Sequence, residues 1–126
     1  MILVLGGTSD SLEICDRINK YEDLPYTLSV TTSYGEDLAR KHAKNVITGK
    51  LTKEDMVRFI EKNNINKIID ATHPYAIEVS KNAIQCAKEL NIDYLRYERK
   101  SLIEDISYEN KYIVSSIEEA CKIARE

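Results

Sequence analysis

Two glycines and two hydroxyl residues follow the first apolar segment of the chain and could bind a phosphate. Residues 2–5 are apolar throughout, and they are followed by Gly6, Gly7, Thr8 and Ser9. Glycine allows a positive φ and lets a phosphate approach backbone N–H groups at the beginning of a helix. The Thr8 and Ser9 hydroxyls could contact the phosphate or cap that helix. An ordinary tight turn remains an alternative, because Thr8 and Ser11 stand where the G-x-G-x-x-G pattern needs glycines.

A second polar segment follows a predicted buried strand at residues 67–70. It contains Thr72, His73 and Tyr75, which we expect to face a cofactor or a substrate. A histidine with a pKa near the reference value of about 6.5 can donate a proton or a hydrogen bond near neutral pH. His73 could equally serve only to fix the turn, and we expect Asp70 to orient that turn rather than to react. No residue is assigned as a catalytic proton donor.

The end of the second predicted strand bears on which dinucleotide the chain would bind. Folds that prefer NAD usually place an Asp or Glu there, where it binds the ribose 2′-hydroxyl. This chain instead has a hydroxyl-rich turn, which contains Thr31, Thr32, Ser33, Tyr34 and Gly35. The turn leaves room for the 2′-phosphate of NADP, with Arg40 or Lys41 as countercharges. Glu36 and Asp37 argue against a phosphate because of their negative charge. Tyr34 could stack on an adenine ring or pack on the surface.

The elements that must position these residues alternate between strands and helices. Strands are predicted at residues 2–5, 27–31, 45–48, 67–70 and 92–96, and helices at residues 9–20 and 36–42, after Thr52 and after Pro74. This alternation is typical of βαβ units. We therefore predict an α/β fold with a Rossmann-like doubly wound parallel sheet of about five strands, in a three-layer sandwich. Its ligand crevice lies outside the carboxyl ends of strands one and four, where the glycine turn and the His73 segment begin.

Two of the predicted helices have further signals. Thr52 and Asp55 have the spacing of a capping box, and the apolar stripe after them contains Met56, Val57 and Ile60. Pro74 suits the first turn of the next helix. The inner stripe of that helix contains Ala76, Val79, Ala83, Ala87 and Leu90.

The last quarter of the chain differs from the rest. Residues 98–111 are polar and charged, which predicts a connection, and residues 112–114 predict a new strand before a helix that Ser116 and Glu119 would cap. We assign residues 1–100 to a Rossmann-like nucleotide-binding lobe. Residues 101–126 are assigned to the connection plus the first strand and helix of a truncated second lobe. The last predicted helix reaches Glu126 without the Gly, Asn or Pro that usually ends a helix, so we expect the chain to be a fragment.

The composition argues against several classes of protein. The 18 basic and 21 acidic residues are interspersed and give a net charge of −3, without the basic stripe that is typical of nucleic-acid binding. No apolar run approaches the roughly 18 residues of a membrane span, and the first apolar segment lacks the basic flank of a signal peptide, so we expect a cytoplasmic protein. Cys15, Cys86 and Cys121 are far apart, and we predict buried apolar residues rather than disulfides or metal ligands.

Taken together, these motifs resemble those of the precorrin-6A reductase family of cobalamin biosynthesis. The resemblance rests on residues 2–9, 32–35, 69–76 and 96–99, and it spans roughly residues 1–115. Its specific part is the run Asp-Ala-Thr-His-Pro-aromatic-Ala, because a glycine turn alone fits many nucleotide-binding proteins.

The resemblance implies an NADPH-dependent reductase that delivers a hydride to a double bond of the precorrin-6A macrocycle, or of its cobalt-containing counterpart, to give the 6B form. It also implies two Rossmann-like lobes with the active site between them. The chain has about half the family length, so the C-terminal lobe that would grip this tetrapyrrole would be missing, and the fragment alone would be inactive. By position, the Gly6 to Ser9 turn would meet the cofactor phosphates and residues 32–35 the adenosine half. Thr72, His73 and Tyr75 would line the nicotinamide and macrocycle side, with no metal site.

Two alternatives to this interpretation remain. A short-chain dehydrogenase would need a Tyr-x-x-x-Lys motif, but at Tyr108 the spacing fails, because Lys111 stands one position early. A sensor or regulatory domain that binds NADP without turnover would use the same phosphate turn, and a fragment without its second lobe would behave in the same way.

Overall fold

Parallel strands form the centre of the fold. The computed structural model describes residues 1–21, 24–49, 51–73, 76–97 and 111–114. The strands are β1 (Ile2–Leu5), β2 (Tyr26–Val30), β3 (Val46–Thr48), β4 (Lys67–Asp70), β5 (Asp93–Tyr97) and β6 (Lys111–Val114). The helices are α1 (Ser9–Ile18), α2 (Ser33–Ala39), α3 (Lys53–Lys62) and α4 (Ile77–Leu90).

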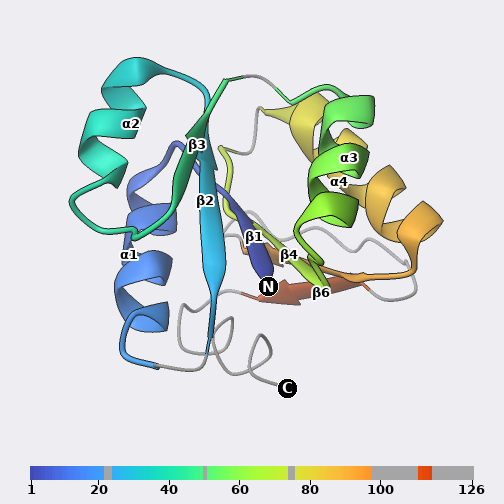
Figure 1. Ribbon diagram of the computed structural model, residues 1–126, viewed down its shortest axis with the longest axis horizontal. Coiled ribbons are helices and arrows are strands. Elements are labelled where there is room, and N and C mark those ends of the chain that lie inside the picture. The colour runs from blue at the N-terminus through green and yellow to red at the C-terminus, as the bar shows by residue number, and fades with distance from the viewer. Residues whose placement is uncertain (22–23, 50, 74–75, 98–110, 115–126) are drawn as a thin grey trace.

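The strand order explains where a ligand could bind. The six-stranded sheet has the order β3-β2-β1-β4-β5-β6, and every neighbouring pair of strands is parallel. Helices α1 and α2 cover one face, and α3 and α4 cover the other (Figure 1). The predicted Rossmann-like sheet and its three layers are therefore confirmed. The order reverses between β1 and β4, so the loops after these two strands leave the sheet in opposite directions from neighbouring points.

The sheet has six strands, and we predicted about five. The strand expected at residues 112–114 is β6, and it pairs in parallel with β5, from Lys111 beside Tyr94 to Val114 beside Tyr97. It therefore lies at the edge of the same sheet as β1 to β5. The division of the chain at about residue 100 and the second lobe stay predictions. The expected cap at Ser116 and Glu119, the helix after it and Cys121 lie outside the described residues.

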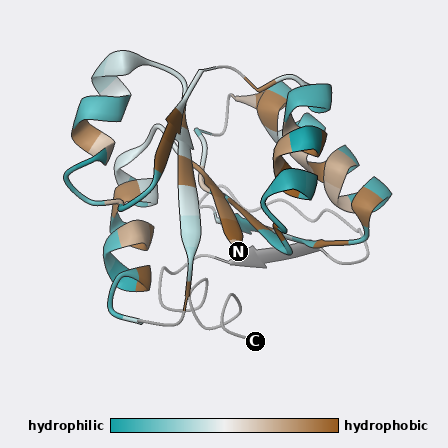
Figure 2. Ribbon diagram, in the orientation of Figure 1, coloured by the Kyte–Doolittle hydropathy of each residue, from teal (hydrophilic) through white to brown (hydrophobic). Residues whose placement is uncertain are grey.

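The sheet separates the core into two parts, one on each face, and β1 is buried on both faces. Ile2 and Val4 pack on the α1 side, whereas Leu3 and Leu5 pack on the side of α3 and α4. Figure 2 shows the resulting apolar ribbon of β1 between helices that carry both hydrophobic and hydrophilic residues. A strand with alternating apolar and polar residues would not suit this position, because its polar side chains would be buried. Cys15 and Cys86 are buried free thiols, as predicted.

Several helices begin at side-chain caps. The predicted capping box of α3 is confirmed, because the Asp55 N–H donates to Thr52 Oγ1 at 3.2 Å and the Thr52 N–H donates to Asp55 Oδ2 at 3.4 Å. The helix that we expected at residues 36–42 begins instead at Ser33, because Thr32 caps it by accepting the Gly35 N–H at 3.0 Å. Helix α4 begins at Ile77, and Pro74 lies outside the described residues. Among the described helices, none has the length and apolar character needed to cross a membrane.

The substitution Thr52→Ala is expected to lower the free energy of unfolding of the chain by about 1 kcal/mol, because it removes the side-chain cap of α3. Thr52→Ser should keep most of that stability, since serine supplies the same hydroxyl. Urea denaturation followed by circular dichroism measures both effects. Glu61→Ala, at an exposed position of the same helix, is the matched control and should change stability by less than about 0.5 kcal/mol. An alanine variant as stable as the parent chain would contradict the role of the cap.

Candidate functional site

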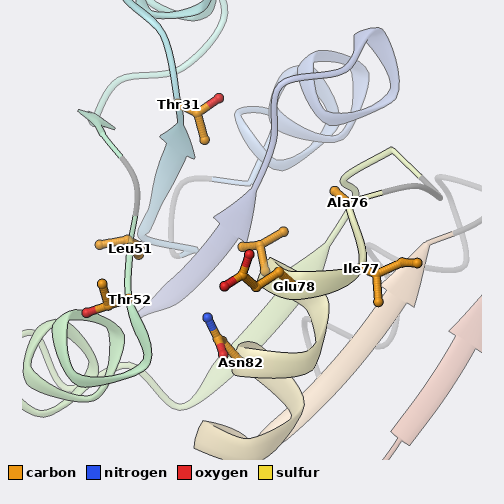
Figure 3. Close-up of a pocket in the computed structure, with 8 residues that line it drawn as sticks. Thr31, Leu51, Thr52, Ala76, Ile77, Glu78 and Asn82 are labelled. Atoms are coloured by element: carbon orange, nitrogen blue, oxygen red, sulfur yellow. The ribbon is translucent and has the colours of Figure 1, made fainter.

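Two adjoining hollows form a groove at the carboxyl edge of the sheet. The first hollow, of about 200 Å³, lies at the strand-order reversal and is lined by loops after β1, β2, β3 and β4. The second, of about 360 Å³, lies between the beginnings of α3 and α4 (Figure 3). Both are lined by Thr31, Leu51, Ala76 and Val79. We call the two hollows together the carboxyl-edge groove, and this is where an open parallel sheet usually binds its ligand.

The two glycines after β1 are required for different reasons. A Cβ atom on Gly6 would lie 2.6 Å from Leu28 Cδ1 and 2.8 Å from Ser11 Oγ, so a side chain there would force these two buried side chains to move. Gly7 has a φ of +99°, and a Cβ atom on it would meet nothing within 4 Å. Gly7 is exposed and lines the first hollow, and a residue without a side chain there leaves room for a phosphate to approach the backbone.

Of the two roles considered for the Thr8 hydroxyl, capping is the one seen in the structure. Thr8 Oγ1 accepts the Ser11 N–H at 3.1 Å and donates to the carbonyl oxygen of Ala71 at 2.7 Å. The hydroxyl thus begins α1 and also ties the glycine turn to the loop after β4. Ser9, the first residue of α1, is exposed. Contact of this turn with a phosphate remains a prediction.

The residues predicted near the adenosine half form the first turn of α2. The Thr32 side chain caps the helix, and Gly35 lies close against it, because an added Cβ would be 3.1 Å from Thr32 Oγ1. Tyr34 is 81% exposed and does not line the groove. Thr31, which belongs to the predicted hydroxyl-rich turn but not to the cofactor-binding set of residues 32–35, lines both hollows.

The charges near α2 are partly paired with one another. Arg40 donates to Glu36 Oε2 through Nε at 2.9 Å and through Nη2 at 2.6 Å, and Thr48 Oγ1 donates to Glu36 Oε1 at 2.6 Å. The Thr48 hydroxyl and the Arg40 guanidinium lower the pKa of Glu36. Glu36 is therefore a paired carboxylate. Arg40, which we considered as a countercharge for a phosphate, is already paired with Glu36.

A buried hydrogen-bond network lies at the end of β4, around the carboxylate of Asp70. Its Oδ1 accepts Arg96 Nη1 at 2.8 Å, Thr72 Oγ1 at 2.6 Å and the Thr72 N–H at 3.1 Å, and its Oδ2 accepts the Tyr94 hydroxyl. Asp70 is fully buried, and Arg96 is 5% exposed. Burial and the negative charge of Asp70 raise the pKa of Tyr94, so its hydroxyl stays protonated and donates. The expectation that Asp70 orients the turn agrees with these contacts.

This network fixes Thr72 directly before His73. Thr72 is buried, whereas His73 is exposed and lines the first hollow together with Thr72. The His73 carbonyl accepts the Ala76 N–H at 2.8 Å, which closes the turn toward α4. The structure therefore brings Thr72 and His73 to the same hollow as Gly6, Gly7 and Thr8. Tyr75, the third residue predicted on this side, lies outside the described residues.

Sequence reasoning missed Tyr94 and Arg96 as partners of Asp70. The available signal was an arginine and a tyrosine two positions apart in a predicted buried strand, because alternate residues of a strand face the same side. The pairing register places Arg96 beside Asp70. The lining residues Leu51, Val79 and Asn82 were likewise not predicted as site residues, since the groove forms only when the loops after β3 and β4 come together.

The fold and the groove define this chain as a Rossmann-type domain, and comparison with known proteins gives its family. The model of the family "Precorrin-6x reductase CbiJ/CobK" matches residues 1–125, and the chain belongs to this family. The cobalt-precorrin-6A reductase of Methanocaldococcus jannaschii is 44% identical over 125 residues, covering 99% of this chain and 49% of that protein. That of Priestia megaterium is 44% identical over 127 residues, covering 100% of this chain and 48% of that protein.

Solved structures support the fold. A structure described as CobK precorrin-6A reductase matches with a TM-score of 0.67 and 20% identity, over 86% of this chain and 40% of that one. A short-chain dehydrogenase/reductase from Veillonella parvula, solved in complex with NADP, matches with a TM-score of 0.59 and 14% identity, over 80% of this chain and 48% of that one. The chain thus spans about half the length of the curated relatives that it matches.

Replacement of Asp70 by alanine is expected to lower the free energy of unfolding by about 3–5 kcal/mol, because the buried Arg96 guanidinium would lose its counterion. Tyr94→Phe removes a single hydrogen bond to the carboxylate and should cost about 1.5–3 kcal/mol. Urea denaturation measures both losses. Asp37→Ala removes an exposed carboxylate of α2 and is the control. A loss for Asp70→Ala no larger than that of the control would show that the network does not stabilise the fold.

Proposed function

We propose that the full-length protein is a cytoplasmic, NADPH-dependent reductase that converts cobalt-precorrin-6A, or its metal-free form, to the 6B form in cobalamin biosynthesis. The described chain would supply the cofactor-binding wall of the active site. The second half of the full-length protein would supply the lobe that grips the tetrapyrrole. The observation that carries the proposal is a groove with an open Gly7 backbone at the strand-order reversal, in a chain 44% identical to proteins named cobalt-precorrin-6A reductase.

The residues present fit a dinucleotide. Gly7 leaves open space at the N-terminus of the ten-residue helix α1, where N–H groups and the helix dipole favour a phosphate. The tip of β2 carries Thr31 and Thr32 rather than a carboxylate, which leaves room for a 2′-phosphate. The Glu36 carboxylate is neutralised in part by Arg40, so it opposes that phosphate less than the sequence suggested.

The chemistry of the chain's own residues is binding and orientation. NADPH, when bound, supplies the hydride. The buried Asp70 network holds Thr72 and the following turn, so His73 lines the first hollow from a fixed backbone. From there His73 would donate a hydrogen bond to the nicotinamide or to the macrocycle, which helps to align donor and acceptor.

The proposal is tested by an NADPH oxidation assay at 340 nm with the full-length protein, using precorrin-6A and its cobalt form as separate substrates. We expect oxidation with one of them, and tighter binding of NADPH than of NADH in a fluorescence titration. Binding of NADPH without oxidation of either substrate would support a sensor domain instead. Equal affinities for NADPH and NADH would contradict the proposed cofactor preference.

His73→Ala in the full-length protein is expected to lower the rate of macrocycle reduction by about tenfold, which corresponds to the loss of one hydrogen bond of about 1.4 kcal/mol in the transition state. The melting temperature should change little, because His73 is exposed. Steady-state kinetics and thermal unfolding measure the two effects. His42→Ala removes the other histidine, which is bound to Asp16 away from the groove, and should leave turnover unchanged. Unaltered turnover in His73→Ala would leave His73 with a role in the turn alone.

A further inference from the structure

Ser80 of α4 connects one wall of the groove to the turn that carries His73. The Ser80 side chain is half-buried and lines neither hollow, and its Oγ lies 3.3 Å from Thr72 Oγ1. We propose that Ser80 is a positioning residue, which holds His73 at a fixed place relative to the α4 wall of the groove. The inference rests on the proposed function, because His73 is the group that Ser80 would position for the reduction.

The direction of the hydrogen bond between Ser80 and Thr72 follows from the Asp70 carboxylate. A hydroxyl has one proton to donate and two lone pairs that accept. Thr72 uses its proton toward Asp70 Oδ1 at 2.6 Å, so Ser80 is the donor in its contact with Thr72. The other lone pair of Thr72 accepts Arg96 Nη1 at 3.0 Å. Thr72 therefore lines the first hollow with no hydroxyl donor or acceptor left for a ligand, and its part in the site is to hold the turn.

Ser80 also interacts with the other hydroxyl that donates to Asp70. The Tyr94 hydroxyl donates to Asp70 Oδ2, and the same hydroxyl forms a hydrogen bond with the Ser80 side chain. Burial and the negative charge of Asp70 raise the pKa of Tyr94, and the hydrogen bond with Ser80 opposes this rise. Ser80 thus joins α4 to the buried network of β4, β5 and the loop after β4.

The beginning of α4 has no side-chain cap of its own. Ala76 precedes this helix and has no polar side chain, whereas the first three helices are capped by Thr8, Thr32 and Thr52. The Ser80 N–H donates to the Ala76 carbonyl oxygen at 3.4 Å, which is long for a helical hydrogen bond. The contact of the Ser80 side chain with the buried network therefore anchors the first turns of α4 in place of a cap.

The same part of α4 forms one wall of the groove. Val79, directly before Ser80 in the chain, lines both hollows, and Asn82 lines the second (Figure 3). A ligand against this wall is placed relative to His73 by a short path, which runs from Ser80 to Thr72 and then to the adjoining His73. Reaction rates are sensitive to such distances, because a misplacement of about 1 Å can cost about 100-fold.

The test introduces Ser80→Ala into the full-length protein and into its His73→Ala variant. If Ser80 acts through His73, Ser80→Ala should lower kcat for macrocycle reduction about fivefold in the first case and less than about twofold in the second. The KM for NADPH should stay within about twofold of its original value, since the contact positions a group rather than binds the cofactor. Ser80→Thr keeps the hydroxyl and should restore most of the rate. Gln85→Ala, at an exposed position of α4, is the control and should leave the rate unchanged.

Ser80→Ala is expected to fold, because Asp70 keeps its Arg96 counterion and no buried charge loses its partner. Its melting temperature should fall by about 2–4 °C, as for the loss of one neutral hydrogen bond. A loss of kcat of equal size in both backgrounds would show that Ser80 supports only the fold, and so would a failure of Ser80→Ala to fold. An unchanged kcat in Ser80→Ala would also overturn the proposal.

A measurement without turnover separates this proposal from the proposed function. In NMR spectra of the full-length protein, Ser80→Ala should shift the imidazole signal of His73. The signal of His42, which pairs with Asp16 away from the groove, should not move. Spectra of His73→Ala and His42→Ala identify the two signals. An unmoved His73 signal would contradict the positioning role even in an active reductase, whereas a shifted signal in a protein without reductase activity would contradict the proposed function alone.

Discussion

The buried charge of Asp70 is the interaction on which the geometry of the site depends. A carboxylate without exposure to water is tolerated in a protein only when a counterion and hydrogen bonds replace its hydration. Here Arg96 supplies the counterion, and Tyr94 and Thr72 supply the remaining hydrogen bonds. The carboxylate can accept hydrogen bonds from all of these groups only while the backbone at the end of β4 keeps its present conformation. Because the buried carboxylate would be unstable without these contacts, they restrain the backbone that leads to His73.

A second restraint joins the two turns that face each other across the strand-order reversal. The Thr8 hydroxyl begins α1 and binds the carbonyl oxygen of Ala71, so the loop after β1 is linked to the loop after β4. Gly6 packs closely against Leu28 of β2 and Ser11 of α1, which also restrains this loop. Gly7 is the residue left open to the groove. Most of this turn serves the packing of the domain, and a short stretch of its backbone is available to a ligand.

The charged residues around α2 show that a charge in the sequence is not always available to a ligand, because it can already be paired within the protein. Arg40 and Glu36 are one helical turn apart and pair with each other, and Thr48 from the neighbouring β3 binds the second oxygen of Glu36. The cation that could have bound a phosphate and the anion that could have repelled it therefore compensate each other. Under the proposed function, a 2′-phosphate at this edge would be recognised by hydroxyl and backbone N–H groups more than by a free arginine.

The sequence by itself determined the parallel α/β fold, the two polar turns and the caps of several helices, because these depend on local periodicity and on contacts three or four residues apart. The run Ile2 to Leu5 required a strand covered on both faces, and Thr52 with Asp55 required the beginning of a helix. Local signals failed at α2, where the cap at Thr32 moved the beginning of the helix into the predicted turn. Only the tertiary structure decided that Asp70 is paired with Arg96, that Thr31 rather than Tyr34 lines the groove, and that Leu51 and Asn82 lie at one hollow. Those contacts join residues that are distant along the chain, and they are set by the register and order of the strands, which local sequence patterns do not encode.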